Sequence, residues 1–387
     1  MPSPAPTSRR LHALAAVLAL CACGGPQPAA TPATTHQPET QQPQTQPATT
    51  QPSETRTTET QPERTPTPTP SNEAITIPQR SSDDELLLAF AGDANAFQGA
   101  ARSVELGLGG AGDLLEAADW SMVNLESALA DDPSGLAKQP KLYTFLTGSS
   151  LPRMLHREGV DVASLANNHA MDYGVAGMER TLAIKQSSEL AMIGVGKNEQ
   201  EAFAPWVGQV RGRDVVALAG NDILESNMDW RPRDGRPGVA MVKTEAGFTA
   251  LLEAVEQQRA ARPQAVVVVF MHWGIDYQIC TSGRQETMAR ELAEAGASIV
   301  VGTHAHRVQR ATTIGDTVVA YGLGNFNFYS DRTATRETGV LSVRVPAAGA
   351  PTAQWFPGRI VDGGPVLLTG QQAADAVERW QSLPGGC

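Results

Sequence analysis

Beyond residue 84 the chain alternates short apolar runs with stretches in which apolar residues recur at helical spacing. The apolar runs predict buried strands at Leu86–Ala91, Met122–Leu125, Val160–Leu165, Val215–Ala219, Val266–Met271 and Ile299–Val301. Helical spacing predicts helices over Leu151–Glu158, Phe248–Gln258 and Gln285–Ala295. After residue 302 the pattern changes to β segments at Thr317–Tyr321, Gly339–Val345 and Trp355–Ile360. This order predicts an α/β fold of two mixed β-sheets flanked by helices, with a more antiparallel end.

Polar side chains follow nearly all of the predicted strands. They are Asp93 and Asn95, Asn124 and Glu126, Asn167, Asn168, His169 and Asp172, His272, and His304 and His306. Of the five histidines in the folded part, only His156 lies elsewhere, on a predicted helix. Ligands of α/β folds bind just beyond the carboxyl ends of the strands. The sequence therefore predicts one site that is built from these strand ends.

The chain is acidic, with a net charge of −11 over 387 residues. Residues 1–80 contain five arginines and five glutamates, so the remaining 25 basic and 36 acidic residues carry the whole net charge. A net acidic domain without a basic run is a poor match to a phosphate backbone. Binding of nucleic acid by a broad basic face is excluded, whereas a small cationic pocket is not.

The first 23 residues have the pattern of a bacterial lipoprotein signal. Two arginines precede the apolar run Leu14–Leu20, which is too short to span a bilayer. The following Cys21-Ala22-Cys23 resembles a lipobox, and Cys23 is the predicted lipidation site because a small residue precedes it. The alternative is an ordinary cleaved signal. We expect an extracytoplasmic protein, anchored by lipid to the cell membrane or the outer membrane of a bacterium.

Residues 24–80 predict a disordered tether. About 36 of these 57 residues are Pro, Thr or Gln, and large apolar residues are nearly absent. Such a segment cannot bury enough apolar area to offset the entropy of ordering it, and its prolines favour extended conformations. The predicted organisation is thus a signal (1–23), a tether (24–80), a folded domain (81–373) and a C-terminal tail (374–387).

The residue types at the strand ends predict a divalent metal site. Carboxylate, carboxamide and imidazole ligands together suit Mn, Zn or Fe, whereas Ca prefers oxygen ligands alone. Two ions about 3.5–4 Å apart usually share a carboxylate, and Asp93 and Glu126 are the candidates for it. No thiolate cluster competes, because Cys280 is alone in the domain and Cys387 is the last residue. Whether these two cysteines pair is left open.

The same residues form an ordered set of short motifs from Leu86 to Phe328. The motifs are Gly92-Asp93, Asn124-Leu125-Glu126, Asn167-Asn168-His169-Ala170-Met171-Asp172-Tyr173-Gly174, His272-Trp273-Gly274, Gly302-Thr303-His304-Ala305-His306 and Gly324-Asn325-Phe326. This set resembles the CapA/PgsA capsule (poly-γ-glutamate) synthesis family, which looks like a branch of the calcineurin-like metallophosphoesterase superfamily. The resemblance implies a four-layer α/β sandwich of two mixed β-sheets flanked by helices.

The resemblance also implies roles for individual residues. The implied metal ligands are Asp93, Glu126, Asn168, His272, His304 and His306, for two ions, with Glu126 in the bridging position. His169 matches the proton donor or oxyanion-stabilising histidine, and Asp172 could orient it and raise its basicity. The implied substrate contacts are Asn95, Asn124 and Asn325, although Gly324-Asn325 could instead form a turn.

Three positions depart from the pattern of these families. Asn95 stands where the superfamily has a histidine, so the first metal could lose a nitrogen ligand. Thr303 stands where the capsule family often has a histidine, and Ala305 where it has a proline.

The resemblance implies a metal-dependent hydrolase that acts in biosynthesis, anchoring or export of an anionic surface polymer such as poly-γ-glutamate. The expected partners are an anionic polymer or phosphoester substrate and a membrane-bound polymer synthase, with no nucleic acid. The alternative is a non-catalytic assembly factor that binds the polymer or the synthase. The His169–Asp172 pair favours an enzyme, because a pure binding protein needs no proton donor. Asn95 favours the alternative.

Overall fold

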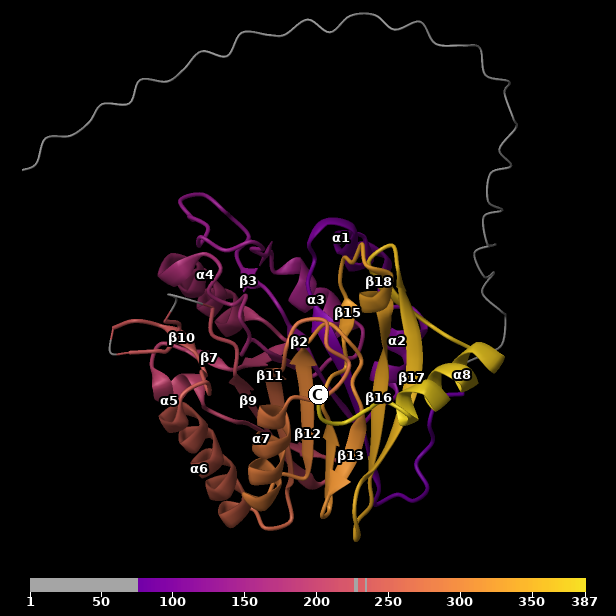
Figure 1. Cartoon of the computed structure of the whole chain (residues 1–387). Coiled ribbons are helices and arrows are strands. Elements are labelled where there is room, and N and C mark those ends of the chain that lie inside the picture. The colour runs from indigo at the N-terminus through magenta and orange to yellow at the C-terminus, as the bar shows by residue number, and fades with distance from the viewer. Residues whose placement is uncertain (1–75, 226–228, 234) are drawn as a thin grey trace, which may run out of the picture. The chain divides into compact units, whose positions relative to one another are not determined.

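The structure is a computed structural model, and it describes residues 76–225, 229–233 and 235–387. The predicted signal, the predicted lipidation site Cys23 and most of the predicted tether lie outside the described residues. Among the described helices, none has the length and apolar character needed to cross a membrane. Sheets and helices of the described part pack in layers (Figure 1).

The first sheet combines strands from the beginning and the end of the described chain. Its eight strands are β1 (Leu86–Ala94), β2 (Trp120–Leu125), β5 (Val162–Ser164), β6 (Ala191–Ile193), β15 (Asn325–Asn327), β16 (Glu337–Val345), β17 (Thr352–Val361) and β18 (Gly364–Leu367). Their order is β18-β17-β16-β1-β2-β5-β6, and β15 pairs with the carboxyl end of β1. Strands β1, β2, β5 and β6 run parallel, whereas β16, β17 and β18 are antiparallel, so the sheet is mixed.

The second sheet has six strands and is mixed as well. They are β8 (Trp206–Val210), β9 (Arg213–Asn221), β11 (Val266–Trp273), β12 (Ile299–His304), β13 (Ala311–Ile314) and β14 (Thr317–Ala320). The order is β13-β14-β12-β11-β9-β8, with a parallel centre and antiparallel edges. Two small pairs lie outside both sheets: β3 (Ala128–Leu129) with β4 (Leu146–Thr147), and β7 (Val195–Gly196) with β10 (Gly238–Val239).

The described residues form eight α-helices, several of which pack against the two sheets. They are α1 (Ala101–Leu106), α2 (Gly110–Glu116), α3 (Ser150–Arg157), α4 (Gly174–Ser187), α5 (Glu199–Ala202), α6 (Glu245–Ala261), α7 (Gly283–Glu294) and α8 (Gly370–Gln381), with 3-10 turns at Gln98–Ala100 and Thr333–Arg336. Helix α2 contacts β1, β2, β16 and β18, whereas α6 contacts β9 and β11 and α7 contacts β12. Figure 1 shows α6 and α7 side by side over the second sheet.

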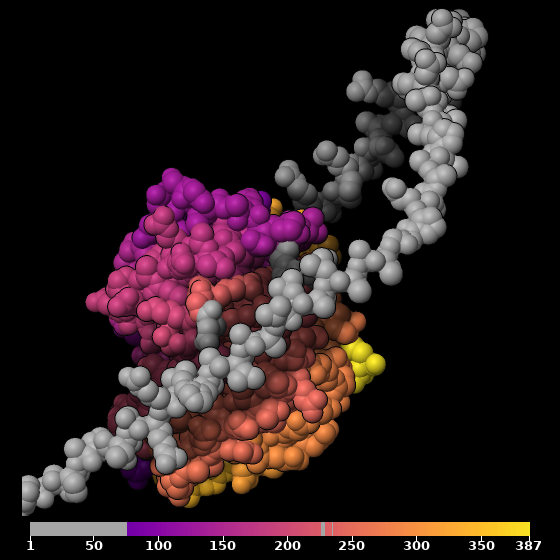
Figure 2. All heavy atoms as spheres, turned by 90° about the vertical axis from the view of Figure 1, so that its left-hand side faces the viewer, coloured from indigo at the N-terminus to yellow at the C-terminus, as the bar shows by residue number. Residues whose placement is uncertain are grey.

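The apolar runs of the second sheet are continuous because both of its faces are buried. Successive side chains of a strand point to opposite faces, so Val268 on β11 joins the core between the sheets while Val267 packs with α6 and α7. Between the sheets, Trp120 of β2 packs on Trp206 of β8 with ring centres 5.5 Å apart. In Figure 2 the part of the chain coloured purple to magenta lies above the part coloured orange. The arrangement confirms the predicted four-layer α/β sandwich.

The C-terminal residues pack on the domain. Helix α8 crosses the boundary predicted at residue 373, and its Trp380 stacks on Trp355 of β17 with ring centres 5.9 Å apart. A disulfide joins Cys280 to Cys387, and the backbone N–H of Cys387 donates to the carbonyl of Thr281 at 2.9 Å. The sequence analysis assigned most of this segment to a tail, and none of the residues of α8 is fully buried.

Candidate metal centre

The polar strand ends of the two sheets converge at one place. Pairing sets Asp93 of β1 beside Asn124 of β2 and beside Asn325 of β15. In the second sheet, His272 of β11 pairs with Thr303 of β12. The amide Nδ2 of Asn124 then links the sheets, at 2.7 Å from Oδ1 of Asp93 and 3.2 Å from Nδ1 of His272. The structure therefore brings together the residues that the sequence predicts for one site.

Close approach of two strands positions Asp93. The backbone N–H of Asp93 donates to the carbonyl oxygen of Gly324 at 3.0 Å. A Cβ atom at Gly92 would lie 1.9 Å from that same oxygen, so only glycine allows the approach. The glycine of the Gly92-Asp93 motif is therefore required by the close approach of the backbone at Gly324.

Glu126 follows β2 and is completely buried, yet neither carboxylate oxygen has a hydrogen-bond partner among the described residues. Its Oε1 lies 3.6 Å from Nε2 of His272 and 3.7 Å from Nε2 of His169. Burial, and then the charge of Asp93, raise the pKa of Glu126 well above its ordinary value. A buried carboxylate that lacks partners and faces imidazoles is expected where a metal ion completes the site.

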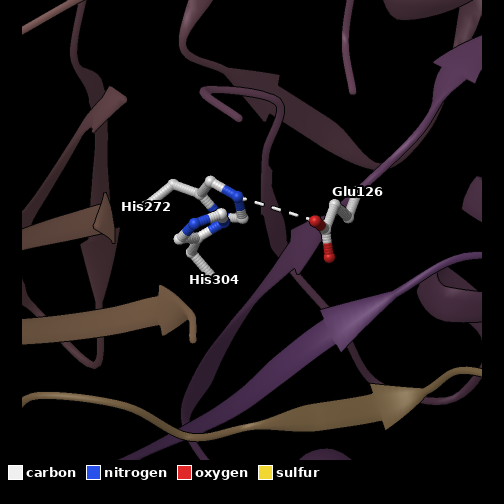
Figure 3. A group of neighbouring side chains, drawn as sticks. All are labelled: Glu126, His272 and His304. Atoms are coloured by element: carbon white, nitrogen blue, oxygen red, sulfur yellow. Dashed lines mark ion pairs between the residues drawn. The ribbon is translucent and has the colours of Figure 1, made fainter. Parts of the chain in front are cut away.

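Two sets of side chains hold potential ligand atoms within 4.8 Å of one another. One set is Glu126, His272 and His304, and the other is Asp93, Glu126 and His306. In Figure 3 the two imidazoles of the first set lie next to each other and face the Glu126 carboxylate. Ligand atoms about 2.0–2.2 Å from an ion lie roughly 3–3.6 Å from each other, so these residues fit divalent ions. Glu126 belongs to both sets and is placed to bridge two ions.

Burial keeps two of the histidines in the form that binds metals. The pKa values of His272 and His304 lie well below the ordinary value, first because of burial and then because of neighbouring histidines. A neutral imidazole has a lone pair to offer to a metal. Oγ1 of Thr303 lies 3.0 Å and Nδ2 of Asn124 3.2 Å from Nδ1 of His272, so these contacts orient the ring with Nε2 toward the candidate ligands.

His304 at the end of β12 and His306 two residues later both have positive φ values, of 91° and 53°. Residues with a side chain rarely adopt such angles, and they persist mainly at functional sites. The backbone N–H of His304 donates to Oδ2 of Asp93 at 3.3 Å, and Nδ1 of His306 lies 2.7 Å from Oδ1 of Asn325. Asn325 therefore orients a candidate ligand.

Asn168 lies against the same ring nitrogen as Glu126. Its Oδ1 is 2.9 Å from Nε2 of His272, and its Nδ2 donates to Oε1 of Glu225 at 3.2 Å. The bond to Glu225 fixes which side of the amide faces the site. The oxygen is thereby placed beside the ligand set of Glu126, His272 and His304.

Asn124 lies behind the candidate ligands. It is completely buried, and its Oδ1 accepts from Nδ2 of Asn167 at 3.1 Å. Asn167 also donates to the carbonyl of Leu125 at 2.8 Å and accepts from the backbone N–H of His169 at 3.0 Å. These contacts favour a positioning role for Asn124 over the predicted substrate contact.

His169 and Asp172 form a buried pair beside the ligand sets. Nδ1 of His169 lies 2.7 Å from Oδ2 of Asp172, and the ring stacks on Phe145 with ring centres 4.2 Å apart. Burial lowers the pKa of His169, and the hydrogen bond to Asp172 opposes that shift. The ring is thus fixed with Nε2 toward Glu126.

Lys141 is a site residue that the sequence does not indicate. Its Nζ lies 2.8 Å from Oδ1 of Asp172 and 2.7 Å from Oε1 of Glu225, and it donates to the carbonyl of Asn168 at 2.8 Å. It comes from the irregular segment between β3 and β4, where a single lysine has no recognisable pattern. Asp276 was missed as well, although it follows the His272 motif closely; its Oδ1 lies 3.3 Å from Nε2 of His304.

A cavity of about 300 Å³ opens beside these groups, lined by Asn95, His169, His306 and Asn325 among others. Oδ1 of Asn95 accepts from the backbone N–H of Phe97 at 3.1 Å, and Asn95 belongs to neither ligand set. Larger hollows of about 670 and 880 Å³ are lined by none of the predicted site residues. The cavity of about 300 Å³ is therefore the one that adjoins the candidate site.

Comparison with known proteins matches residues 87–330 to a family described as "Bacterial capsule synthesis protein PGA_cap". The chain is 29% identical over 237 residues to the "PGA biosynthesis protein CapA" of Bacillus subtilis, which covers 61% of this chain and 60% of the relative. It is 26% identical over 256 residues to the "Capsule biosynthesis protein CapA" of Bacillus anthracis, covering 66% and 61%. The chain thus spans about three fifths of the length of these curated relatives.

A third relative, from Mycobacterium tuberculosis, is described as a "Probable polyglutamine synthesis accessory protein" and is 26% identical over 213 residues, covering 54% of this chain and 55% of the relative. A solved Thermus thermophilus hypothetical protein is 18% identical, with a TM-score of 0.43, covering 70% of this chain and 99% of its own. That score is too low to support a functional argument. The match over residues 87–330 includes the strands of both sheets that carry the candidate site residues. The chain belongs to the bacterial capsule synthesis protein family.

Proposed function

We propose that this protein is a lipid-anchored, metal-dependent hydrolase of the cell envelope. It would act in biosynthesis, anchoring or export of an anionic surface polymer such as poly-γ-glutamate. The names of the relatives, "PGA biosynthesis protein" and "Capsule biosynthesis protein", support the polymer. The strand-end residues support the chemistry.

The environment of Glu126 is the main observation in support of the hydrolase proposal. It is buried, both of its oxygens lack partners among the described residues, and it belongs to two ligand sets that each contain histidine. Burial of this carboxylate without partners is destabilising, and a bound divalent ion would offset that cost. Two divalent ions, Mn, Zn or Fe, would supply Lewis-acid polarisation of a phosphoester or a related electrophile.

The residues of the chain would bind the ions, donate the proton and orient the proton donor. Asp93, Asn168, His272, His304 and His306 would hold the ions together with Glu126. In its imidazolium form, which the carboxylate of Asp172 favours, His169 would donate a proton from Nε2 to the leaving group. Asp172 would orient His169 through Nδ1, which lies 2.7 Å from Oδ2.

The proposed location rests on the sequence of the first 80 residues. Lipid on Cys23 would anchor the chain, and the Pro-rich segment 24–80 would hold the domain away from the membrane. A membrane-bound polymer synthase is the proposed partner. The relative named an accessory protein of polyglutamine synthesis supports that association.

The alternative is a non-catalytic assembly factor. Asn95 favours it, because this residue replaces an expected histidine, bonds Phe97 through Oδ1 and belongs to neither ligand set. Such a factor would use the site to hold the polymer or the synthase, without cleaving a bond.

The test combines metal analysis with a deletion strain. The purified full-length protein would be loaded with Mn, Zn or Fe, analysed for metal content, and assayed on phosphomonoesters and phosphodiesters. His169→Asn would then be compared with the wild type for hydrolysis and for surface polymer in a strain that lacks the gene. His156→Asn is the matched control, because His156 is exposed on α3.

We expect His169→Asn to bind metal but to fail in both hydrolysis and complementation, whereas His156→Asn behaves as wild type. Full complementation by His169→Asn would favour the assembly factor, even if some phosphatase activity could be measured on the purified protein.

A further inference from the structure

The cavity beside the candidate metal centre is lined by two unlike groups of residues. One group is the predicted site residues Asn95, His169, His306 and Asn325. The rest of the lining, here called the aromatic side, consists of Phe97, Tyr143, Phe145, Tyr277, Phe328 and Tyr329 with the polar residues Gln98, Ser330, Asp331, Arg332 and Thr335. A ligand whose reacting group lay at the metal centre and that filled this cavity would meet both groups.

Arg332 is a free cation at the aromatic side. Its guanidinium carbon lies 4.4 Å from the ring centre of Tyr277, the side chain is exposed, and it forms no ion pair within the described residues. Stacking on a ring fixes the plane of a guanidinium and leaves its N–H groups available to a carboxylate. Asp331 also lines the cavity and is exposed.

Asn95 supplies a second donor. Its Nδ2 has no hydrogen-bond partner within the described residues, although the residue is only 1% exposed and lines the same cavity. A buried donor without a partner is destabilising unless a ligand or water satisfies it. The cavity thus presents hydrogen-bond donors at Asn95 and Arg332.

Aromatic rings line much of the cavity around these donors. Phe145 packs against Phe97 and Phe328, with ring centres 5.3 and 5.7 Å apart, and the ring of His306 lies 5.2 Å from that of Phe328. Apolar walls with spaced donors fit a chain whose hydrocarbon stems alternate with acceptor groups. A linear chain of carboxylate-bearing units has that chemistry.

We propose that this cavity is a subsite for an acidic chain, in which Arg332 binds a carboxylate remote from the reacting group and Asn95 binds an acceptor between them. This proposal rests on the proposed function, because that function places the reacting group of the ligand at the metal centre. It deepens that function by making Arg332 the residue that selects an acidic chain over a neutral one.

The test measures binding, not turnover. Calorimetric titration of the full-length protein would compare a linear γ-glutamate tetramer with the same tetramer carrying carboxamides in place of its side carboxylates. Arg332→Gln should weaken binding of the acid by about tenfold or more, because a charge-assisted bond is lost, and should leave the amide unchanged. Arg290→Gln is the matched control, because Arg290 is exposed on α7 and does not line the cavity.

The subsite is wrong if Arg332→Gln weakens both ligands equally, or changes the acid no more than Arg290→Gln does. Unchanged thermal unfolding would show that Arg332→Gln folds normally. Selective loss of acid binding in a protein that hydrolyses nothing would support the subsite and overturn the proposed catalysis. Hydrolysis by the wild type, with the same preference for acid over amide in Arg332→Gln, would support the proposed catalysis and overturn the subsite.

Discussion

The ammonium group of Lys141 lies 2.8 Å from Oδ1 of Asp172, and both side chains are buried, at 4% and 0% exposure. The other oxygen of Asp172 accepts from the backbone N–H of Phe145 and faces His169. Lys141 thereby ties the irregular segment between β3 and β4 to the proposed proton donor. Its charge also offsets that of a carboxylate with little access to water.

Lys141→Met should destabilise the fold. Removing one partner leaves Asp172 buried without its counter-charge, which costs roughly 3–5 kcal/mol for a buried pair. Urea unfolding should report that loss, and Lys138→Met should change little because Lys138 is exposed in the same segment. Equal stability of the two variants would show that Asp172 does not depend on Lys141.

Glu126→Gln should lower metal content from about two ions per chain towards one or none. A neutral amide cannot bridge two cations or offset their repulsion. Asn95→Ala should lose little metal, because Asn95 lies outside both ligand sets. Equal losses in the two variants, measured by elemental analysis, would remove the bridging role from Glu126.

The same substitution should stabilise the metal-free protein. Glu126 is fully buried and its oxygens lack partners among the described residues, so its charge opposes folding when no ion is bound. We expect the free energy of unfolding in a chelator to rise by roughly 1–3 kcal/mol in Glu126→Gln. A decrease would mean that the carboxylate stabilises the fold by itself.

His169→Asn should reduce turnover about 10²–10⁴-fold, the usual effect of a positioned general acid. Metal content should stay near that of wild type, because His169 belongs to neither ligand set. Asp172→Asn should lose less, since Asp172 acts through His169. Loss of metal in His169→Asn would instead make His169 a ligand.

The double variant Cys280→Ser/Cys387→Ser should be less stable by about 2–4 kcal/mol, since the bond closes a long loop in the unfolded chain. The two cysteines are separated by 107 positions. Dithiothreitol should lower the unfolding temperature of the wild type to that of the variant and should not affect the variant. No response of the wild type to reductant would mean that the bond adds no stability.

The sequence by itself determined the sandwich and the place of the site. Both follow from local order: apolar runs buried on two faces predict parallel strands, and polar residues at their carboxyl ends meet at one edge. That is why Asp93, Glu126 and His272 could be named from the chain alone. The resemblance to the family motifs then assigned His169 a different expected role from the candidate metal-ligating histidines.

Only the tertiary structure decided which residues from distant segments contact one another at the candidate site. Lys141 and Asp276 enter the site from irregular loops, where no periodicity marks a residue, and Asn124 was predicted to face a substrate but lies behind the ligands. The stacking of Arg332 on Tyr277 joins segments more than fifty residues apart. Such contacts depend on packing between elements, and packing is a property of the folded chain that local sequence does not encode.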